Sequence, residues 1–180
     1  MTDKPQLALD FDSVLAATHR TASDLIGVDY DYEDVETWDW PLETFGRNRA
    51  LSALWHAWTI RPQEIEPMEE NLSEKVAALH SKYNVHIVTA HPDHQGISEG
   101  KQQWLDDHGI GHEDFVKVPM ASTKAKLGYD VFIDDKPTLP ERAGPDQTVY
   151  VRDHPYNRDI EGEHIRIESI TDPLKYDVEI

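Results

Sequence analysis

The chain alternates between short apolar runs and longer polar stretches, and each apolar run ends in polar residues. Runs this short and this rich in β-branched residues are typical of strands that are buried on both faces, as in a parallel sheet. We therefore predict strands at residues 6–10, 84–89, 114–118, 129–134 and 147–151, with a weaker one at 164–167.

Helical periodicity lies between these strands. One amphipathic pattern covers residues 72–83, and a second covers residues 94–109 and ends on a glycine suited to a helix C-cap. The apolar residues of each fall on one face: Leu72, Val76, Leu79 and Tyr83 on the first, and Ile97, Trp104 and Leu105 on the second. Alternating strands and helices predict right-handed crossovers and an α/β fold with a Rossmann-like, doubly wound parallel sheet.

The segment between the first two strands is too long for a single crossover. It contains two helical patterns, near residues 18–28 and 47–58, on either side of the acidic aromatic stretch DYDYEDVETWDWP. We expect that stretch to be a solvated loop, because it lacks the glycine and the final glutamate of a calcium-binding EF-hand loop. We predict that residues 16–71 form a small helical cap, and that residues 1–15 and 72–180 form the catalytic core.

Composition narrows the class of protein. The 180 residues are 38% apolar and contain no cysteine, which indicates a globular chain without disulfides or thiolate metal ligands. No apolar stretch approaches the roughly 18 residues of a membrane span. The opening MTDKPQ leaves no room for a signal peptide before the first strand. We therefore expect a cytoplasmic protein.

The net charge of the chain argues against two classes of binding partner. The formal net charge is −18, from 35 acidic and 17 basic residues. Such a field repels nucleic acid duplexes and anionic membranes, so we expect neither as a partner. The acidic residues are scattered along the chain, which is typical of a halophilic protein because high salt screens their mutual repulsion. The sequence is compatible with a homodimer.

Polar residues with catalytic potential follow several of the predicted strands. Asp10 and Asp12 end the first strand, Thr89 ends the second, and Asp134 with Asp135 ends the fourth. Ligands of open α/β sheets bind beyond the carboxyl ends of the strands, so these side chains are expected to meet in one crevice. Lys124 is expected there too, since its spacing before Asp134 suits the site better than that of Lys126.

The chemistry of this set fits phosphoryl transfer. Clustered carboxylates require a divalent cation, and oxygen ligands suit Mg²⁺. The cation and Lys124 would neutralise a phosphoryl group, to which Thr89 offers a hydroxyl donor. Asp10 is then placed to attack phosphorus and form an aspartyl-phosphate, while Asp12 carries the proton to the leaving oxygen and later takes one from water.

The motifs LALDFDSVL, IVTAH and VFIDD, together with Lys124, resemble those of the haloacid dehalogenase superfamily of phosphohydrolases. Within it, the cap length, VFIDDKP and HPYNR resemble the cytosolic-type 5′(3′)-deoxyribonucleotidases. The resemblance implies that Mg²⁺ is held by Asp10, by the backbone carbonyl of Asp12 and by Asp134, Asp135 or both. One position departs from the pattern, since Ser13 stands where the superfamily usually has glycine, a residue that tolerates strained backbone more easily.

The aromatic residues of the cap bear on the substrate. Trp38 and Trp40 are candidates for stacking on a nucleobase, whereas Trp55 and Trp58 also fit a small core within the cap itself. On the helix after the second strand, Lys101 is expected to reach the substrate's phosphate or sugar. Two further sets are expected near the site: Ala90 beside Thr89, and Arg152, His154, Tyr156 and Asn157 at its rear.

These observations predict a Mg²⁺-dependent phosphomonoester hydrolase acting on a nucleoside monophosphate. Two alternatives stay open. The same site would serve another small phosphate ester, such as a sugar phosphate or phosphoglycolate. The fold would also serve a non-catalytic phosphate-binding protein, because fold alone does not determine function.

Overall fold

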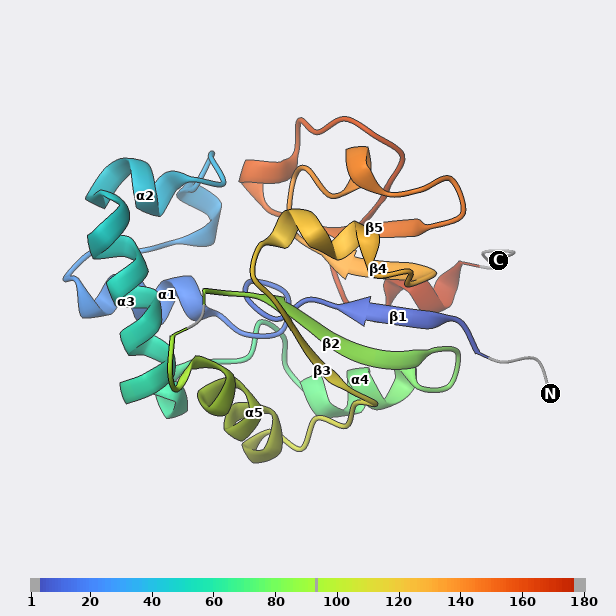
Figure 1. The fold of residues 1–180 in the computed structure, drawn as a ribbon, viewed down its shortest axis with the longest axis horizontal. Coiled ribbons are helices and arrows are strands. Elements are labelled where there is room, and N and C mark those ends of the chain that lie inside the picture. Colours follow the sequence, from blue (N-terminus) through green and yellow to red (C-terminus); the bar gives the residue numbers. More distant parts are fainter. Residues whose placement is uncertain (1–3, 93, 177–180) are drawn as a thin grey trace.

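A six-stranded parallel sheet forms the centre of the computed structural model, which describes residues 4–92 and 94–176 (Figure 1). The strand order is β3-β2-β1-β4-β5-β6, and every neighbouring pair is parallel. The predicted strands and the doubly wound α/β class are thereby confirmed. The strands are β1 Gln6–Leu9, β2 Asn84–Ala90, β3 Phe115–Val118, β4 Val131–Asp134, β5 Thr148–Arg152 and β6 Ile165–Ile167.

Strand β1 is central because both of its faces are covered and both of its edges are paired. Leu9 lies beside Ile87 of β2 on one side and Ile133 of β4 on the other, and all three are buried. Burial on both faces explains why the strand reads as a continuous apolar run. The backbone N–H of Asp10 donates to the Ile133 carbonyl at 2.9 Å, so the ladder continues up to the first carboxylate after the strand.

The two faces of the sheet are covered differently. The helices α4 Leu72–Leu79 and α5 Ile97–Asp107 pack on one face, where the predicted apolar residues of both are buried. On the other face, the crossovers after β3 and β4 contain only the short 3-10 helices η3 Ala121–Lys126 and η4 Pro140–Arg142. Two more 3-10 helices, η5 Pro155–Asn157 and η6 Asp172–Lys175, follow β5 and β6.

The helices between β1 and α4, from Thr18 to Glu64, form a helical unit beyond the carboxyl ends of the strands, drawn in blue to teal in Figure 1. Its elements are α1 Thr18–Leu25, η1 Tyr32–Asp34, α2 Trp40–Phe45, α3 Arg47–Ile60 and η2 Pro62–Glu64. The carboxyl-terminal end of α3 lies directly against α5. A Cβ atom on Gly100 of α5 would be 2.1 Å from the Trp58 carbonyl oxygen, so only glycine permits this approach.

The acidic aromatic stretch differs from the solvated loop that its charge predicts. Tyr30, Tyr32 and Val35 are buried together with Ala17, and Trp40 packs against this cluster. The acidic residues between them face solvent, so the stretch alternates between buried aromatic and exposed charged positions. Among residues 4–92 and 94–176, no helix has both the length and the apolar character to cross a membrane.

Candidate active site

The end of β1 leads into a tight turn that presents two carboxylates. Phe11 is fully buried and accepts backbone hydrogen bonds from Leu15 and Ala16, which anchors the turn beneath the site. Ser13 closes the turn with φ 64°, a left-handed conformation that favours glycine. Asp10 and Asp12 therefore leave the turn at the carboxyl edge of the sheet, as the sequence predicts.

Lys124 joins two of the predicted carboxylates. Its Nζ lies 2.6 Å from Asp10 Oδ1 and 2.7 Å from Asp134 Oδ2, and all three side chains are buried. Burial alone would lower the pKa of Lys124, but the two carboxylates outweigh it, so the pKa is raised and the ammonium stays charged. Burial, with Asp134 nearby, raises the pKa of Asp10 to about 6, against the opposing effect of Lys124.

Asp135 is buried beside this pair and differs from Asp134 in how its oxygens are used. Both oxygens of Asp134 are occupied, by Lys124 and by the backbone N–H of Lys136 at 2.9 Å. Asp135 Oδ2 accepts a hydrogen bond from the Tyr156 hydroxyl at 2.5 Å, whereas its buried Oδ1 has no hydrogen-bond partner among the described residues. Burial raises the pKa of Asp135, as do the nearby charges of Asp10 and Asp134.

These carboxylates fit a divalent cation. Oxygens of Asp10, Asp134 and Asp135 lie within 4.8 Å of one another in the described part of the chain. A buried carboxylate oxygen without a partner is costly, and an oxygen-seeking cation such as Mg²⁺ would supply that partner. The free Oδ1 makes Asp135 the better candidate for direct ligation, a choice that the sequence left open.

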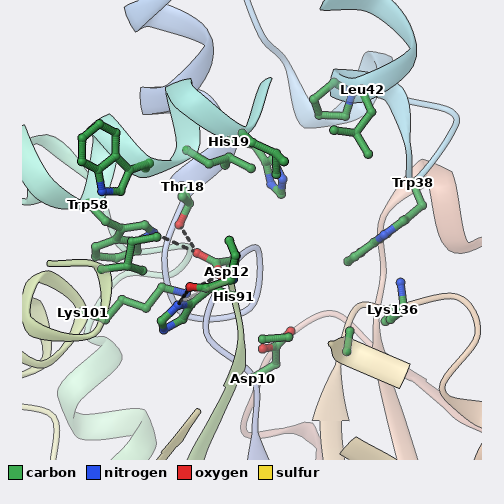
Figure 2. Close-up of a pocket in the computed structure, with 18 of the residues that line it drawn as sticks. Asp10, Asp12, Thr18, His19, Trp38, Leu42, Trp58, His91, Lys101 and Lys136 are labelled. Carbon is green, nitrogen blue, oxygen red and sulfur yellow. Dashed lines mark hydrogen bonds and ion pairs between the residues drawn. The ribbon is translucent and has the colours of Figure 1, made fainter. Parts of the chain in front are cut away.

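Asp12 is held by three donors from three different elements (Figure 2). Its Oδ1 accepts from the Thr18 hydroxyl of α1 at 2.6 Å and from the Trp58 indole N–H of α3 at 3.2 Å. Its Oδ2 accepts from Lys101 Nζ of α5 at 2.5 Å. Burial would raise the pKa of Asp12, but the Lys101 ammonium and the hydrogen bonds from Lys101 and Thr18 outweigh it and lower the pKa.

Lys101 also donates to the Thr89 hydroxyl at 2.7 Å, so the lysine connects two of the predicted site residues. It is 1% exposed, although lysine is rarely buried without partners. Phe11 and Trp58 complete its surroundings, with their ring centres 4.9 and 5.2 Å from Nζ. The lysine side chain is thus committed to Asp12 and Thr89 in this structure.

A pocket opens above these carboxylates, between the sheet edge and the helical unit (Figure 2). Its floor contains Asp10, Asp12, Lys124 and Asp134. The walls are largely apolar and aromatic, with Trp38, Pro41, Leu42, Leu51, Leu54, Trp55, Trp58, Pro92 and Ile97 contributing. A charged floor beneath an apolar wall suits a ligand with one anionic end and one apolar, ring-containing end.

Of the residues predicted to contact substrate, some line the pocket and one does not. Trp38, Ala90 and Lys101 line the pocket. Trp40 lies elsewhere and packs against Tyr30, with the ring centres 5.0 Å apart. Trp55 and Trp58 line the pocket as well, instead of forming a core confined to the cap: Trp58 packs on Phe11 and Trp104, and Trp55 donates its indole N–H to the Gln95 carbonyl.

Residues after β5 support the site from behind. His154 Nε2 lies 2.9 Å from the Ser13 carbonyl oxygen, and the Asn157 side-chain amide donates to the Asp135 carbonyl at 2.9 Å. Burial lowers the pKa of His154 to about 4, so the ring is neutral and donates to Ser13. Arg152 turns away and pairs with Glu69.

The pocket residues that sequence reasoning missed include three with polar side chains that bear on the chemistry: Thr18, His19 and Lys136. The Lys136 ammonium lies 4.3 Å from the centre of the Trp38 ring, and so links the helical unit to the loop after β4. Its position directly after Asp135 was a usable signal. Thr18 and His19 carry no such signal. They lie at the start of α1, and the sequence does not show that the turn after β1 places this helix over Asp12.

The family model for 5′ nucleotidase, deoxy (pyrimidine), cytosolic type C protein matches residues 4–176. A search of curated proteins found no match.

Solved structures share the fold. A haloacid dehalogenase-like hydrolase from Streptococcus pneumoniae has a TM-score of 0.61 at 13% identity, covering 98% of this chain and 99% of that one. A haloacid dehalogenase-like hydrolase from Burkholderia xenovorans has a TM-score of 0.62 at 12% identity, covering 98% and 97%. The hydrolase YfnB from Bacillus subtilis, bound to magnesium, has a TM-score of 0.53 at 13% identity, covering 97% and 98%.

Proposed function

Because the chain belongs to the family of cytosolic type C 5′ nucleotidases, which are phosphoric monoester hydrolases of the haloacid dehalogenase superfamily, we propose that it hydrolyses nucleoside monophosphates with the help of Mg²⁺. The observation that carries this proposal is the position of Asp10. Its Oδ1 lies 2.6 Å from the ammonium of Lys124, and it shares a carboxylate cluster with Asp135, whose Oδ1 has no hydrogen-bond partner among the described residues. A dianionic phosphoryl group and a cation therefore have adjacent places beside one nucleophilic carboxylate.

In the first step, a carboxylate oxygen of Asp10 forms a bond to phosphorus while the bond from phosphorus to the ester oxygen breaks. Asp12, once protonated, delivers its proton to that oxygen, which leaves as a neutral alcohol. Lys124 and the Thr89 hydroxyl stabilise the charge on the other phosphoryl oxygens.

In the second step, a water oxygen forms a bond to the phosphorus of the aspartyl-phosphate, and its proton passes to Asp12. The bond from phosphorus to Asp10 then breaks, which releases inorganic phosphate and restores both carboxyl groups. The Lys101 contact supports this step, because it lowers the pKa of Asp12 and so favours the form that accepts a proton.

Asp10, Asp134, Asp135 and the Asp12 backbone carbonyl would hold the Mg²⁺ ion. When bound, the ion offsets the repulsion between the buried carboxylates and the incoming phosphoryl group. The Tyr156 hydrogen bond occupies Oδ2 of Asp135, so Oδ1, which has no partner among the described residues, is available as a ligand.

The pocket wall favours a nucleoside as the leaving group. Trp38 stands across the pocket from Trp58, and both come from the helical unit (Figure 2). Flat aromatic walls suit a nucleobase, which has a π-face whatever its identity. Residues 16–71 would act as the cap, closing over the substrate and excluding water. The family's cytosolic type and the acidic surface support a cytoplasmic, salt-tolerant enzyme.

Phosphate release from a panel of esters tests the proposal. The panel contains deoxynucleoside and ribonucleoside 5′- and 3′-monophosphates, a sugar phosphate and phosphoglycolate, each with and without Mg²⁺. We expect turnover to be highest with nucleoside monophosphates, to require Mg²⁺ and to disappear in Asp10→Asn. Preference for the sugar phosphate or phosphoglycolate would sink the nucleotidase assignment, and activity in Asp10→Asn would sink the aspartyl-phosphate route.

A further inference from the structure

Ser13 stands in a left-handed turn that glycine would occupy without strain, and its side chain is fully buried. A non-glycine residue at φ 64° is uncommon and calls for a compensating interaction. The Ser13 hydroxyl has two: it lies 2.9 Å from Nδ1 of His19 and 3.3 Å from the Tyr32 hydroxyl. The serine is thus the middle member of a chain of three polar groups.

The direction of this chain follows from the donors available. Tyr32 is buried and its hydroxyl makes no other hydrogen bond among the described residues, so Ser13 Oγ is the acceptor for its proton. A buried donor without an acceptor is costly. The Ser13 hydroxyl, which accepts from Tyr32, therefore donates its own proton to His19 Nδ1. This leaves the His19 proton on Nε2.

The His19 ring lies at the pocket, beside Asp12 and below Leu42 (Figure 2). It stacks on Tyr30, with ring centres 6.2 Å apart and planes 22° apart. Its Nε2 has no hydrogen-bond partner in the described part of the chain, whereas Thr18, Lys101 and Trp58 are already committed to Asp12. His19 is therefore held by Ser13 and Tyr30 and presents an N–H without a partner at the pocket wall.

We propose that His19 is a substrate-binding residue held in place by Ser13, and that its Nε2–H donates a hydrogen bond to an uncharged oxygen of the leaving group. The inference rests on the proposed function and deepens it. The phosphoryl oxygens belong to Lys124 at the floor, and the aromatic wall above offers a nucleobase little beyond stacking. His19 lines the same pocket on its cap side, with Trp58 to one side of it and Trp38 to the other in Figure 2, where a pentose hydroxyl or ring oxygen of a nucleotide would pass.

Two histidine substitutions separate the role of Nε2 from that of the ring. His19→Gln places an amide N–H near the position of Nε2, whereas His19→Asn can still contact Ser13 but has no donor at that position. The measured quantity is the ratio of kcat/KM for thymidine 5′-monophosphate to kcat/KM for phenyl phosphate, whose leaving group has no oxygen besides the ester one. We expect this ratio to fall about tenfold in His19→Asn and by less in His19→Gln.

Ser13→Gly tests the positioning residue. It removes the hydroxyl and keeps a residue that adopts φ 64° without strain. We expect a fall in the same ratio, and less than additive effects when Ser13→Gly is combined with His19→Asn, because both changes remove one interaction. Thermal unfolding of each variant shows whether it is folded. Ser13→Gly keeps the test available if His19→Asn fails to fold, since it leaves the histidine itself intact.

Failure of this inference differs from failure of the proposed function. If the wild type releases phosphate from neither ester, the proposed function falls and the inference falls with it. If the wild type is active and the ratio is the same in all variants, only the inference is overturned. It is also overturned if His19→Gln loses as much selectivity as His19→Asn, or if the effects of Ser13→Gly and His19→Asn are additive.

Discussion

Lys101 Nζ lies 2.5 Å from Asp12 Oδ2 and 2.7 Å from Thr89 Oγ1, with the lysine side chain buried. The ammonium therefore binds Asp12, which carries the proton in our proposal, and Thr89, which contacts the phosphoryl group. It favours the ionised form of Asp12, which suits water activation, and it opposes the protonated form, which the first step uses. Lys101 sets the balance between the two.

Lys101→Met should disturb this balance in a defined direction. Without the ammonium, burial dominates and the pKa of Asp12 rises, so the limb of the pH–kcat profile that reports Asp12 moves to higher pH. We expect kcat near neutral pH to fall about 10- to 100-fold. Steady-state kinetics between about pH 5 and pH 9 provide the measurement. Gln102→Met, at an exposed position on the same helix, is the control. An unshifted profile would contradict the role given to Lys101.

Trp38 and Trp40 are two residues apart but have different surroundings. Trp38 lines the pocket, so Trp38→Ala should raise KM for a nucleoside monophosphate by about tenfold, the effect of losing one stacking contact. Trp40→Ala should leave KM nearly unchanged and lower the melting temperature, because Trp40 packs on Tyr30 and Phe45. Equal effects of both substitutions on KM would show that Trp38 does not bind the base.

Mg²⁺ should stabilise the folded protein, since it binds the carboxylate cluster only when Asp10, Asp134 and Asp135 are brought together. At a free concentration about 100 times Kd, the expected gain is about 2.7 kcal/mol. Thermal unfolding after treatment with a chelator, with and without added Mg²⁺, measures it. Asp135→Asn should lose most of the gain, whereas Asp106→Asn, at an exposed position, should keep it. A full gain in Asp135→Asn would rule out direct ligation by Asp135.

Gly100 permits the close contact between α5 and the end of α3. In Gly100→Ala the new Cβ would meet the Trp58 carbonyl oxygen at 2.1 Å, so the helices must separate. We expect a loss of about 1–3 kcal/mol in the free energy of unfolding, together with lower kcat as Trp58 moves from Asp12. Gly111→Ala, where nothing lies within 4 Å of the new Cβ, is the matched control. Wild-type stability in Gly100→Ala would refute this contact.

His154 should make stability depend on pH. Its pKa is about 4 in the folded protein and about 6.5 when unfolded. The unfolded state therefore binds more protons between these values. The contribution is fully present above about pH 6.5 and is lost as pH falls through about 4, amounting to about 3 kcal/mol. Urea unfolding at several pH values should show a flatter dependence in His154→Gln than in the wild type. The control is His164→Gln, at a half-exposed position. An unchanged slope in His154→Gln would contradict this assignment.

The pattern of apolar runs was enough to predict the sheet and the edge at which the main polar residues meet. The strands could be predicted because β1, β2 and β4 are buried on both faces, and their sequences are therefore apolar runs. Once those runs are parallel, the residues that follow them must meet at one edge, whatever the loops do. Asp10, Thr89 and Asp134 could therefore be brought together without knowledge of any side-chain contact.

The partners of each side chain, in contrast, depend on how distant segments pack in the folded protein. Lys101 turns to Asp12, 89 residues away in the chain. Asp135 differs from Asp134 in its partners, which are Tyr156 for Asp135 and Lys124 with the Lys136 backbone for Asp134. Burial of the acidic aromatic stretch, and the separation of Trp38 from Trp40, likewise depend on packing between distant segments. Such contacts leave no periodic pattern, because they are set by side-chain direction and desolvation at one place in the fold.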